Sequence, residues 1–284
     1  MCVISRKPVG ATISEETLKK MWDKNSDGGG FIGRLNANSP WVHKKGLMTY
    51  DEAKTEILPY LGEEAEIILH FRIKSKGDIN KEMTHPFEWS RNSKENRLLF
   101  HNGTVRLFTG HDGCSDSSAL ADLLRPVGTK SAHKILTNLV KDNHGRFVSF
   151  VQKEGKDAEI EVFEDNVSEW KDGVWYSNLK HLEETKVTVF GAGAYNEHSS
   201  YYRDQQNRQR QAVQTPLGNL NSPLVKKVVD FYIKKRSLQD TLANRNKIIE
   251  HYSISIMCED FLTDICAKID EGKDSDPILN YFEL

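Results

Sequence analysis

The second residue of the chain is a cysteine, and its position gives it chemistry that an internal cysteine lacks. Aminopeptidases remove an initiator methionine that precedes a small residue, which would leave Cys2 with a thiol and a free α-amine. An α-amine has a pKa of about 8, so it can accept the thiol proton directly or through a water molecule. Cys2 is therefore a candidate nucleophile that carries its own base. The alternative is a small buried hydrophobe at the start of a strand.

Five further short motifs follow Cys2 along the chain. They are Asn25-x-Asp27-Gly28-x-Gly30, His70-x-Arg72-x-x-Ser75-x-Gly77, Thr84-His85-Pro86-Phe87, His101-Asn102-Gly103 and Ser115-Asp116-Ser117. Each motif is short enough to arise by chance, but the whole set in one order is not. Together with Met1-Cys2-Val3-Ile4, they make residues 1–195 resemble the class II glutamine amidotransferases of the N-terminal nucleophile hydrolase superfamily.

The resemblance implies a fold and a reaction. The fold would be α+β, a four-layer αββα sandwich with two antiparallel sheets face to face. In the reaction, Cys2 would form a glutamyl thioester with release of ammonia, and water would then hydrolyse the thioester to glutamate. The resemblance implies no metal and no organic cofactor.

The resemblance also assigns the residues that would bind glutamine. Arg72 would hold the carboxylate, because its planar guanidinium can donate two parallel charge-assisted hydrogen bonds; a structural ion pair is the alternative. Asp116 would accept from the ammonium group, with helix N-capping as an alternative that can coexist. Ser75, Gly77 and His85 complete the set. A generic cysteine hydrolase would use a histidine such as His85 as the base, whereas the resemblance leaves that role to the α-amine.

Asn102 and Gly103 are the predicted oxyanion donors. Negative charge develops on the amide oxygen as the thiol attacks, and a preorganised side-chain amide with a backbone N–H can stabilise it. The competing interpretation is a hairpin turn, for which Asn-Gly is the strongest short signal.

The motif at Asn25, Asp27 and Gly28 is predicted to form a supporting loop near Cys2, where glycine allows close backbone approach. The sequence Ile73-Lys74-Ser75 departs from the family, which commonly has a small residue and then threonine after the arginine. A lysine beside the site could change the shape of the substrate. A different γ-glutamyl compound or small amide therefore remains an alternative substrate.

The elements that must position these residues follow from periodicity and capping signals. Helices are predicted at 14–22, 49–58, 116–124 and 130–140, the second of them opened by a Thr49 and Glu52 capping box. Strands are predicted at 67–73, 97–100, 104–108, 146–152, 158–163, 173–177 and 186–190, and the strands at 97–100 and 104–108 would flank the Asn-Gly turn. The short strands separated by Gly, Asp and Asn indicate antiparallel pairing.

The composition excludes several classes of protein. Charged residues make up 28% of the 284 residues, no apolar stretch approaches the roughly 18 residues of a membrane span, and no secretory signal precedes the motifs. The 39 basic and 41 acidic residues nearly balance, so we expect neither a nucleic-acid nor a membrane partner. Four scattered cysteines without a C-x-x-C pair predict neither a disulfide scaffold nor structural zinc. We therefore expect a soluble cytoplasmic protein.

Three regions are predicted along the chain. Residues 1–195 form the amidotransferase-like domain, 196–222 a polar linker or mobile loop, and 223–284 a helical appendage, with helical periodicity from Leu224 to Ile233 and again from Ile248 to Ile269. The appendage is short for a synthase domain, so we expect a separate acceptor enzyme that docks on it. A non-catalytic interaction module that kept the fold and Met1 is the alternative from another class, and a homo-oligomer is left open.

Overall fold

The computed structural model describes residues 2–75, 77–90, 92–108, 114–182, 222–252, 254, 257, 259–272 and 276–278. This part of the chain is α+β, with two sheets whose strand pairs are all antiparallel. The six-stranded sheet has the order β3-β2-β4-β1-β10-β9 and the four-stranded sheet the order β5-β6-β7-β8. The strands are β1 (Val3–Lys7), β2 (Gly29–Arg34), β3 (Val42–Leu47), β4 (Glu66–Phe71), β5 (Phe87–Glu88), β6 (Glu95–Gly103), β7 (Gly145–Lys153), β8 (Glu159–Phe163), β9 (Glu169–Lys171) and β10 (Val174–Tyr176).

Four helices flank the sheets, and the capping signals that predicted the first two are present. In α1 (Glu15–Lys24) the Ser14 side chain accepts from the N–H of Thr17, and α2 (Tyr50–Ile57) opens with the complete capping box of Thr49 and Glu52. A short 3₁₀ turn (Leu58–Tyr60) follows α2. The remaining two helices are α3 (Asp116–Leu124) and α4 (Thr129–Lys141). The four predicted helices are confirmed.

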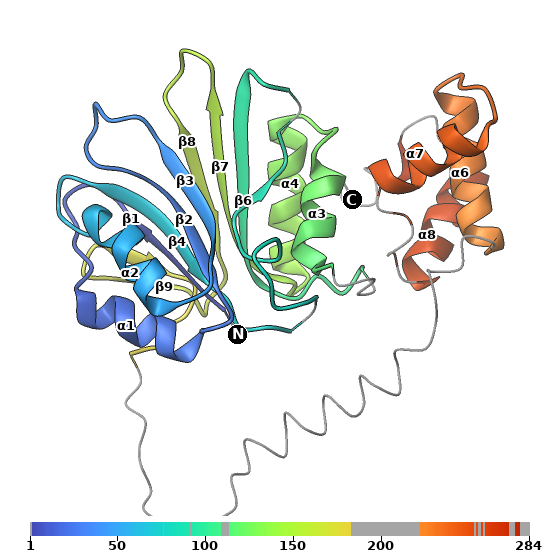
Figure 1. Cartoon of the computed structure of the whole chain (residues 1–284). Coiled ribbons are helices and arrows are strands. Elements are labelled where there is room, and N and C mark those ends of the chain that lie inside the picture. The colour runs from blue at the N-terminus through green and yellow to red at the C-terminus, as the bar shows by residue number, and fades with distance from the viewer. Residues whose placement is uncertain are drawn as a thin grey trace, which may run out of the picture.

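Alternating side chains on the strands divide the core. On β1 and β4, Val3 and Leu69 belong to the apolar cluster that includes the buried faces of α1 and α2, whereas Ile4 and Ile68 belong to a second cluster with Phe100 of β6. In Figure 1, α1 and α2 lie outside the six-stranded sheet, and α3 and α4 lie on the far side of β6. The second cluster therefore lies between the two sheets.

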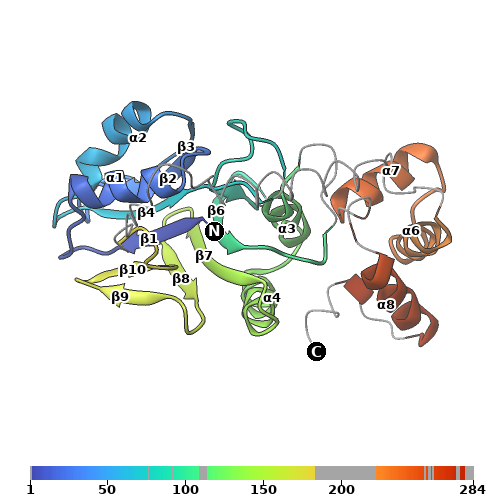
Figure 2. The same ribbon diagram turned by 90° about the horizontal axis from the view of Figure 1, so that it is seen from below.

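Three further helices follow the part of the chain that is not described: α6 (Pro223–Lys235), α7 (Leu242–His251) and α8 (Glu259–Asp270). Their buried side chains join those of α3 and α4 in one apolar cluster, and both views place them beyond α3 and α4 (Figures 1 and 2). The helical period predicted from 248 to 269 is interrupted between α7 and α8. Ile254 and Met257 lie between these two helices, and both are buried. Met257 forms an isolated antiparallel bridge with Phe108.

The predicted Asn-Gly hairpin is wrong. Asn102 and Gly103 are the last two residues of β6, paired with Arg146 and Gly145 of β7, and residues 104–107 form no strand. A helical excursion through α3 and α4 separates β6 from β7, so the chain does not turn at Gly103. The local sequence favours a turn, but no turn forms at Gly103 because β6 pairs with β7 as far as this residue.

The strand predicted at 186–190 and nearly all of the linker predicted at 196–222 lie outside the described residues. Among the helices that are described, none combines the length and apolar character needed to cross a membrane.

Candidate functional site

The pairing of β1 with β4 brings Cys2 beside Arg72. Ile4 lies opposite His70 and Val3 opposite Phe71, so the same register places Cys2 level with Arg72 just beyond the end of the ladder. The Sγ atom of Cys2 donates a hydrogen bond to the carbonyl oxygen of Ile73 at 3.4 Å. Because side chains alternate along a strand, Cys2 lies on the same face as Ile4, which packs between the sheets. The N-terminal end of β1 is visible between the sheets in Figure 2.

The electrostatic surroundings of Cys2 include both of the charges that the sequence analysis selected. Burial raises the pKa of the Cys2 thiol, the positive charge of Arg72 acts to lower it, and the negative charge of Asp116 acts to raise it further. The thiol is therefore protonated at neutral pH in this environment. It needs a base before it can act as a nucleophile.

Arg72 is held at both its backbone and its side chain. Its N–H donates to Gly28 O at 2.8 Å, its carbonyl accepts from Asp27 N at 3.0 Å, and Nη1 donates to Asp78 O at 2.5 Å. The residue is only 4% exposed. Burial lowers the pKa of the guanidinium, while the negative charge of Asp27, and that of the Cys2 thiolate once it forms, counteract that shift.

The predicted supporting loop does contact the Arg72 segment, through Asp27 and Gly28. Asp27 Oδ2 accepts from the N–H of Lys74 at 2.8 Å, which fixes the chain directly after Ile73. Gly28 has a φ of +107°, a conformation that favours glycine. Asn25 instead ends α1, where its Nδ2 donates to Met21 O at 2.9 Å.

Asp116 is the first residue of α3, and both of its carboxylate oxygens accept backbone hydrogen bonds. Oδ2 accepts from Val105 N at 2.6 Å and Oδ1 from Ser117 N at 3.0 Å, with the residue 5% exposed. The N-cap is Ser115, whose side chain accepts from Ser118 N, so the alternative capping role of Asp116 is wrong. The carboxylate joins the end of β6 to the start of α3.

Asn102 and Gly103 lie at the end of β6. Asn102 is fully buried, its Nδ2 lies 2.7 Å from Ser177 Oγ, and its Oδ1 has no hydrogen-bond partner among the described residues. A Cβ atom added to Gly103 would overlap His144 O and lie 2.5 Å from the Cα of Gly145. Glycine is therefore required for the close approach of β6 and β7.

His85 does not form a dyad with Cys2. Its ring packs against His70, with 3.9 Å between ring centroids, and both of its nitrogens are buried without a hydrogen-bond partner in the described part of the chain. Burial lowers its pKa well below the ordinary value, so the ring is neutral. His70 Nε2 in turn donates to His101 O at 3.1 Å. Among the described residues, no three His, Cys, Asp or Glu side chains gather as a metal site requires.

The other two predicted substrate-binding residues lie on the segment that follows Arg72. Ser75 is exposed, and Gly77 has a φ of +73° directly before Asp78, whose carbonyl accepts from Arg72. These residues therefore shape the turn that returns to the guanidinium.

Two residues that the sequence analysis did not single out hold the backbone of Cys2 and Ile4. Ser177 Oγ accepts from Ile4 N at 2.8 Å, and Asn178 Nδ2 donates to Cys2 O at 2.8 Å. The available signal was a polar pair that directly follows the buried run Val174–Tyr176. A sequence pattern alone does not tell which strand such a pair will face.

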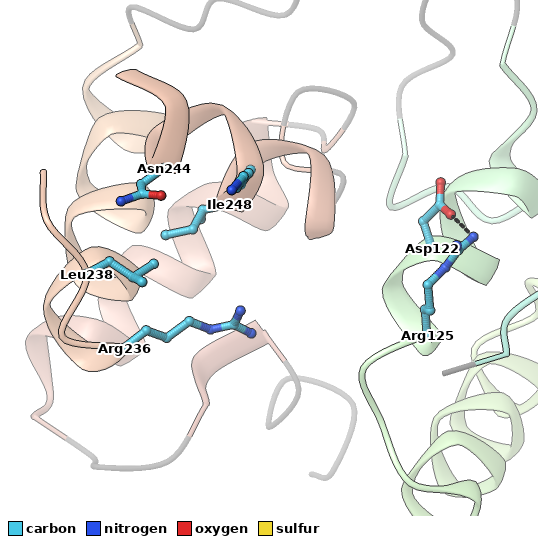
Figure 3. A pocket seen from close by; sticks show the side chains of 7 residues that line it. Asp122, Arg125, Arg236, Leu238, Asn244 and Ile248 are labelled. Carbon is cyan, nitrogen blue, oxygen red and sulfur yellow. Dashed lines mark hydrogen bonds and ion pairs between the residues drawn. The ribbon is translucent and has the colours of Figure 1, made fainter. Parts of the chain in front are cut away.

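A cavity of about 650 Å³ lies elsewhere, between α3 and the α6–α7 connection (Figure 3). Arg236 and Leu238 line one side, and Arg125, which is hydrogen-bonded to Asp122, lines the other. None of the described residues that line it carries a thiol, so this hollow is not the candidate site. None of the candidate site residues is among the described residues that line this cavity.

Comparisons with known proteins find similarity only among solved structures. No protein-family model matches the chain, and no curated protein matches it. Among solved structures, the chain is similar to the glutamine phosphoribosylpyrophosphate amidotransferase from B. subtilis, complexed with ADP and GMP. The two are 15% identical with a TM-score of 0.39, over 62% of this chain and 41% of that one. The chain therefore spans less than half the length of that protein, and the similarity is too low to transfer a family, an activity or a residue role.

Proposed function

We propose that the protein is a glutamine amidohydrolase that releases ammonia, with Cys2 as an N-terminal nucleophile exposed by removal of Met1. One observation carries the proposal: the register of β1 and β4 and the hydrogen bond from Cys2 to Ile73 O bring the thiol beside Arg72, and the charges of Arg72 and Asp116 both act on the pKa of that thiol. Free glutamine carries one carboxylate, one ammonium and one side-chain amide. The proposed cation, anion and nucleophile are Arg72 directly after β4, Asp116 at the start of α3 and Cys2 directly before β1. We also propose that the chain has the four-layer αββα fold of the N-terminal nucleophile hydrolases.

The reaction begins with proton transfer from the thiol to the α-amine of Cys2, because burial keeps the thiol protonated and no histidine is bonded to it among the described residues. Sγ then attacks the amide carbon, and an S–C bond forms. The C–N bond breaks as the α-ammonium returns the proton, and ammonia leaves. Water attacks the glutamyl thioester, which restores the thiol and releases glutamate.

Asn102 and Gly103 would donate to the amide oxygen while it carries negative charge. Arg72 and Asp116 would bind the two ends of the amino acid. Because Arg72 is 4% exposed, the segment after Ile73 must open before a substrate carboxylate reaches the guanidinium.

The experiment combines intact mass with turnover on the full chain. Mass spectrometry of the purified protein should show loss of Met1, and the protein should release ammonia and glutamate from L-glutamine in equal amounts. Cys2→Ala should abolish release. Cys266→Ser is the matched control, because Cys266 lies on α8 and its thiol donates to Leu224 O, and it should leave the rate unchanged.

Two results would contradict this proposal, and each would favour one of the alternatives. Turnover of another γ-glutamyl compound or small amide, with none of glutamine, would keep Cys2 as the nucleophile and change the substrate. Retained Met1 with no turnover of any amide would indicate a non-catalytic interaction module.

The acceptor of the ammonia is proposed to be a separate protein that docks on the helices after Pro223. Leu242 at the start of α7 is 76% exposed and is a suitable probe of that surface. Pull-down with the full chain should recover a synthetase-like enzyme, and Leu242→Glu should weaken its recovery. Equal recovery with both forms would place the docking surface elsewhere.

A further inference from the structure

Ser177 connects the strand of the nucleophile to the predicted oxyanion donor. Its Oγ atom lies 2.8 Å from Ile4 N on β1 and 2.7 Å from the side-chain amide of Asn102 on β6. Ser177 and Asn102 are both fully buried. The contact between Ser177 and Asn102 therefore crosses from the six-stranded to the four-stranded sheet. Ile4, which Ser177 also contacts, is two residues after Cys2 in the chain.

The end of β10 explains why this side chain is available. Ser177 N still donates to Ile4 O at 2.9 Å, as the antiparallel ladder with β1 requires. The return bond from Ile4 N goes to the Ser177 hydroxyl, which takes the place that a main-chain carbonyl has in a regular ladder. The chain leaves the sheet here, and Asn178 reaches back to Cys2 O with its own side chain.

The side-chain amide of Asn102 can adopt two orientations that occupy the same space. A 180° rotation about the Cβ–Cγ bond relates them and exchanges Oδ1 with Nδ2. The structure has Nδ2 toward Ser177, and in this orientation the hydroxyl accepts two hydrogen bonds while Oδ1 is left buried without a partner among the described residues. With Oδ1 toward Ser177, the hydroxyl accepts from Ile4 N and donates to Oδ1. Only the second orientation uses the hydroxyl as both donor and acceptor, and it leaves Nδ2 as the unpartnered group.

We infer that Ser177 is a positioning residue that holds the Asn102 amide in the second orientation, rotated by 180° from the one in the structure, with Nδ2 available to donate to the oxyanion. The inference rests on the proposed function, because only an amide-cleaving reaction creates that oxyanion. An oxyanion is stabilised by an N–H donor and repelled by a carbonyl oxygen. The hydroxyl therefore decides whether Asn102 stabilises or opposes the developing charge.

The test is a double-mutant cycle on glutamine hydrolysis with the full chain. Ser177→Ala should lower kcat by about tenfold to a hundredfold, with KM within about twofold, because the lost interaction is made only in the transition state. Asn102→Ala should lower kcat by about 10²–10³-fold. Adding Ser177→Ala to Asn102→Ala should cost nothing more, because the hydroxyl acts through the amide.

Three controls separate orientation of the amide from support of the fold. Ser177→Thr keeps a hydroxyl and should keep kcat within about threefold. Ser5→Ala removes a hydroxyl on β1, next to Ile4, that is equally buried and has no hydrogen-bond partner among the described residues, and it should leave kcat unchanged. Iodoacetamide alkylates a thiol without forming an oxyanion, so the alkylation rate of Cys2 should be the same in Ser177→Ala and wild type.

Full additivity of the two substitutions, or a fall in the Cys2 alkylation rate in Ser177→Ala equal to the fall in kcat, would overturn the inference and leave the proposed function intact. An inactive wild type would instead remove the proposed function. In that case a crystal structure that distinguishes nitrogen from oxygen would still decide the amide orientation, and Nδ2 directed at Ser177 would overturn the inference by itself.

Discussion

The carbonyl oxygen of Ile73 accepts a hydrogen bond from the Cys2 thiol at 3.4 Å, and Ile73 directly follows Arg72 in the chain. The residue that bonds the Cys2 thiol and the cation proposed to bind the substrate carboxylate are therefore consecutive in the chain. Any movement of the segment after β4 changes both together. This coupling links opening of the site to the environment of the thiol.

The reactivity of Cys2 should depend on whether Met1 is present. In a chain with an N-terminal tag, Met1 is kept and Cys2 has no free α-amine. We expect alkylation of Cys2 by iodoacetamide to be half-maximal above pH 9 in that chain, because burial raises the thiol pKa above its ordinary value of 9.0. In the chain that begins at Cys2, the adjacent α-amine should bring the midpoint to lower pH. The measurement is the alkylation rate of the N-terminal peptide, by mass spectrometry, across the pH range. Identical profiles for the two chains would exclude the α-amine as the base.

Asp27→Ala should weaken substrate binding. Asp27 Oδ2 anchors Lys74 N at 2.8 Å, and hydrogen bonds to charged groups contribute about 1.5–3 kcal/mol, so we expect KM for glutamine to rise by about tenfold. Asp23→Ala is the matched control, because Asp23 forms an exposed ion pair with Lys19 on α1, away from the Arg72 segment. Steady-state kinetics on both variants checks the prediction. A lower kcat at unchanged KM would show that Asp27 acts on the chemical step instead.

Gly30→Ala should destabilise the fold. A Cβ atom at Gly30 would overlap His85 O and lie 2.5 Å from Lys44 O, and backbone atoms of neighbouring segments cannot move aside as a flexible side chain can. We expect the free energy of unfolding to fall by about 2–3 kcal/mol in urea denaturation. Gly62→Ala, where a Cβ atom meets nothing within 4 Å, should change it by about 0.5 kcal/mol or less. Equal losses in the two variants would contradict the steric explanation.

The free energy of unfolding should fall as the pH falls below about 6.5. Burial lowers the pKa of His70 to about 3, so the unfolded chain binds a proton there that the folded chain does not. The stabilisation is complete above the unfolded pKa of about 6.5 and decreases toward pH 3, with His70 alone accounting for about 2 kcal/mol between pH 6.5 and 5.

Urea denaturation at several pH values checks this dependence. His70→Gln keeps a donor for His101 O and should flatten the curve between pH 6.5 and 4, whereas His43→Gln, at an exposed position of β3, should not. A curve for His70→Gln that is as steep as that of the wild type would assign the acid sensitivity to other groups.

Local sequence signals were sufficient to predict the first four helices. Ser14, and Thr49 with Glu52, cap their helices as predicted, because a cap satisfies backbone groups within the same turn. Cys2, Arg72 and Asp116 were selected by residue type and motif order, and the structure brings them within electrostatic reach of one another. The catalytic and binding roles of these residues stay predictions.

Only the tertiary structure decided the rest, because the deciding contacts join residues far apart in the chain. Asn102-Gly103 carries a turn signal, yet pairing with β7 keeps it in a strand. Ser177 is predicted as the end of a strand, and only the facing of two sheets places its hydroxyl against Asn102, 75 residues away. The sequence by itself determined which groups are available for chemistry. Their partners depend on strand register and sheet packing, which no local pattern encodes.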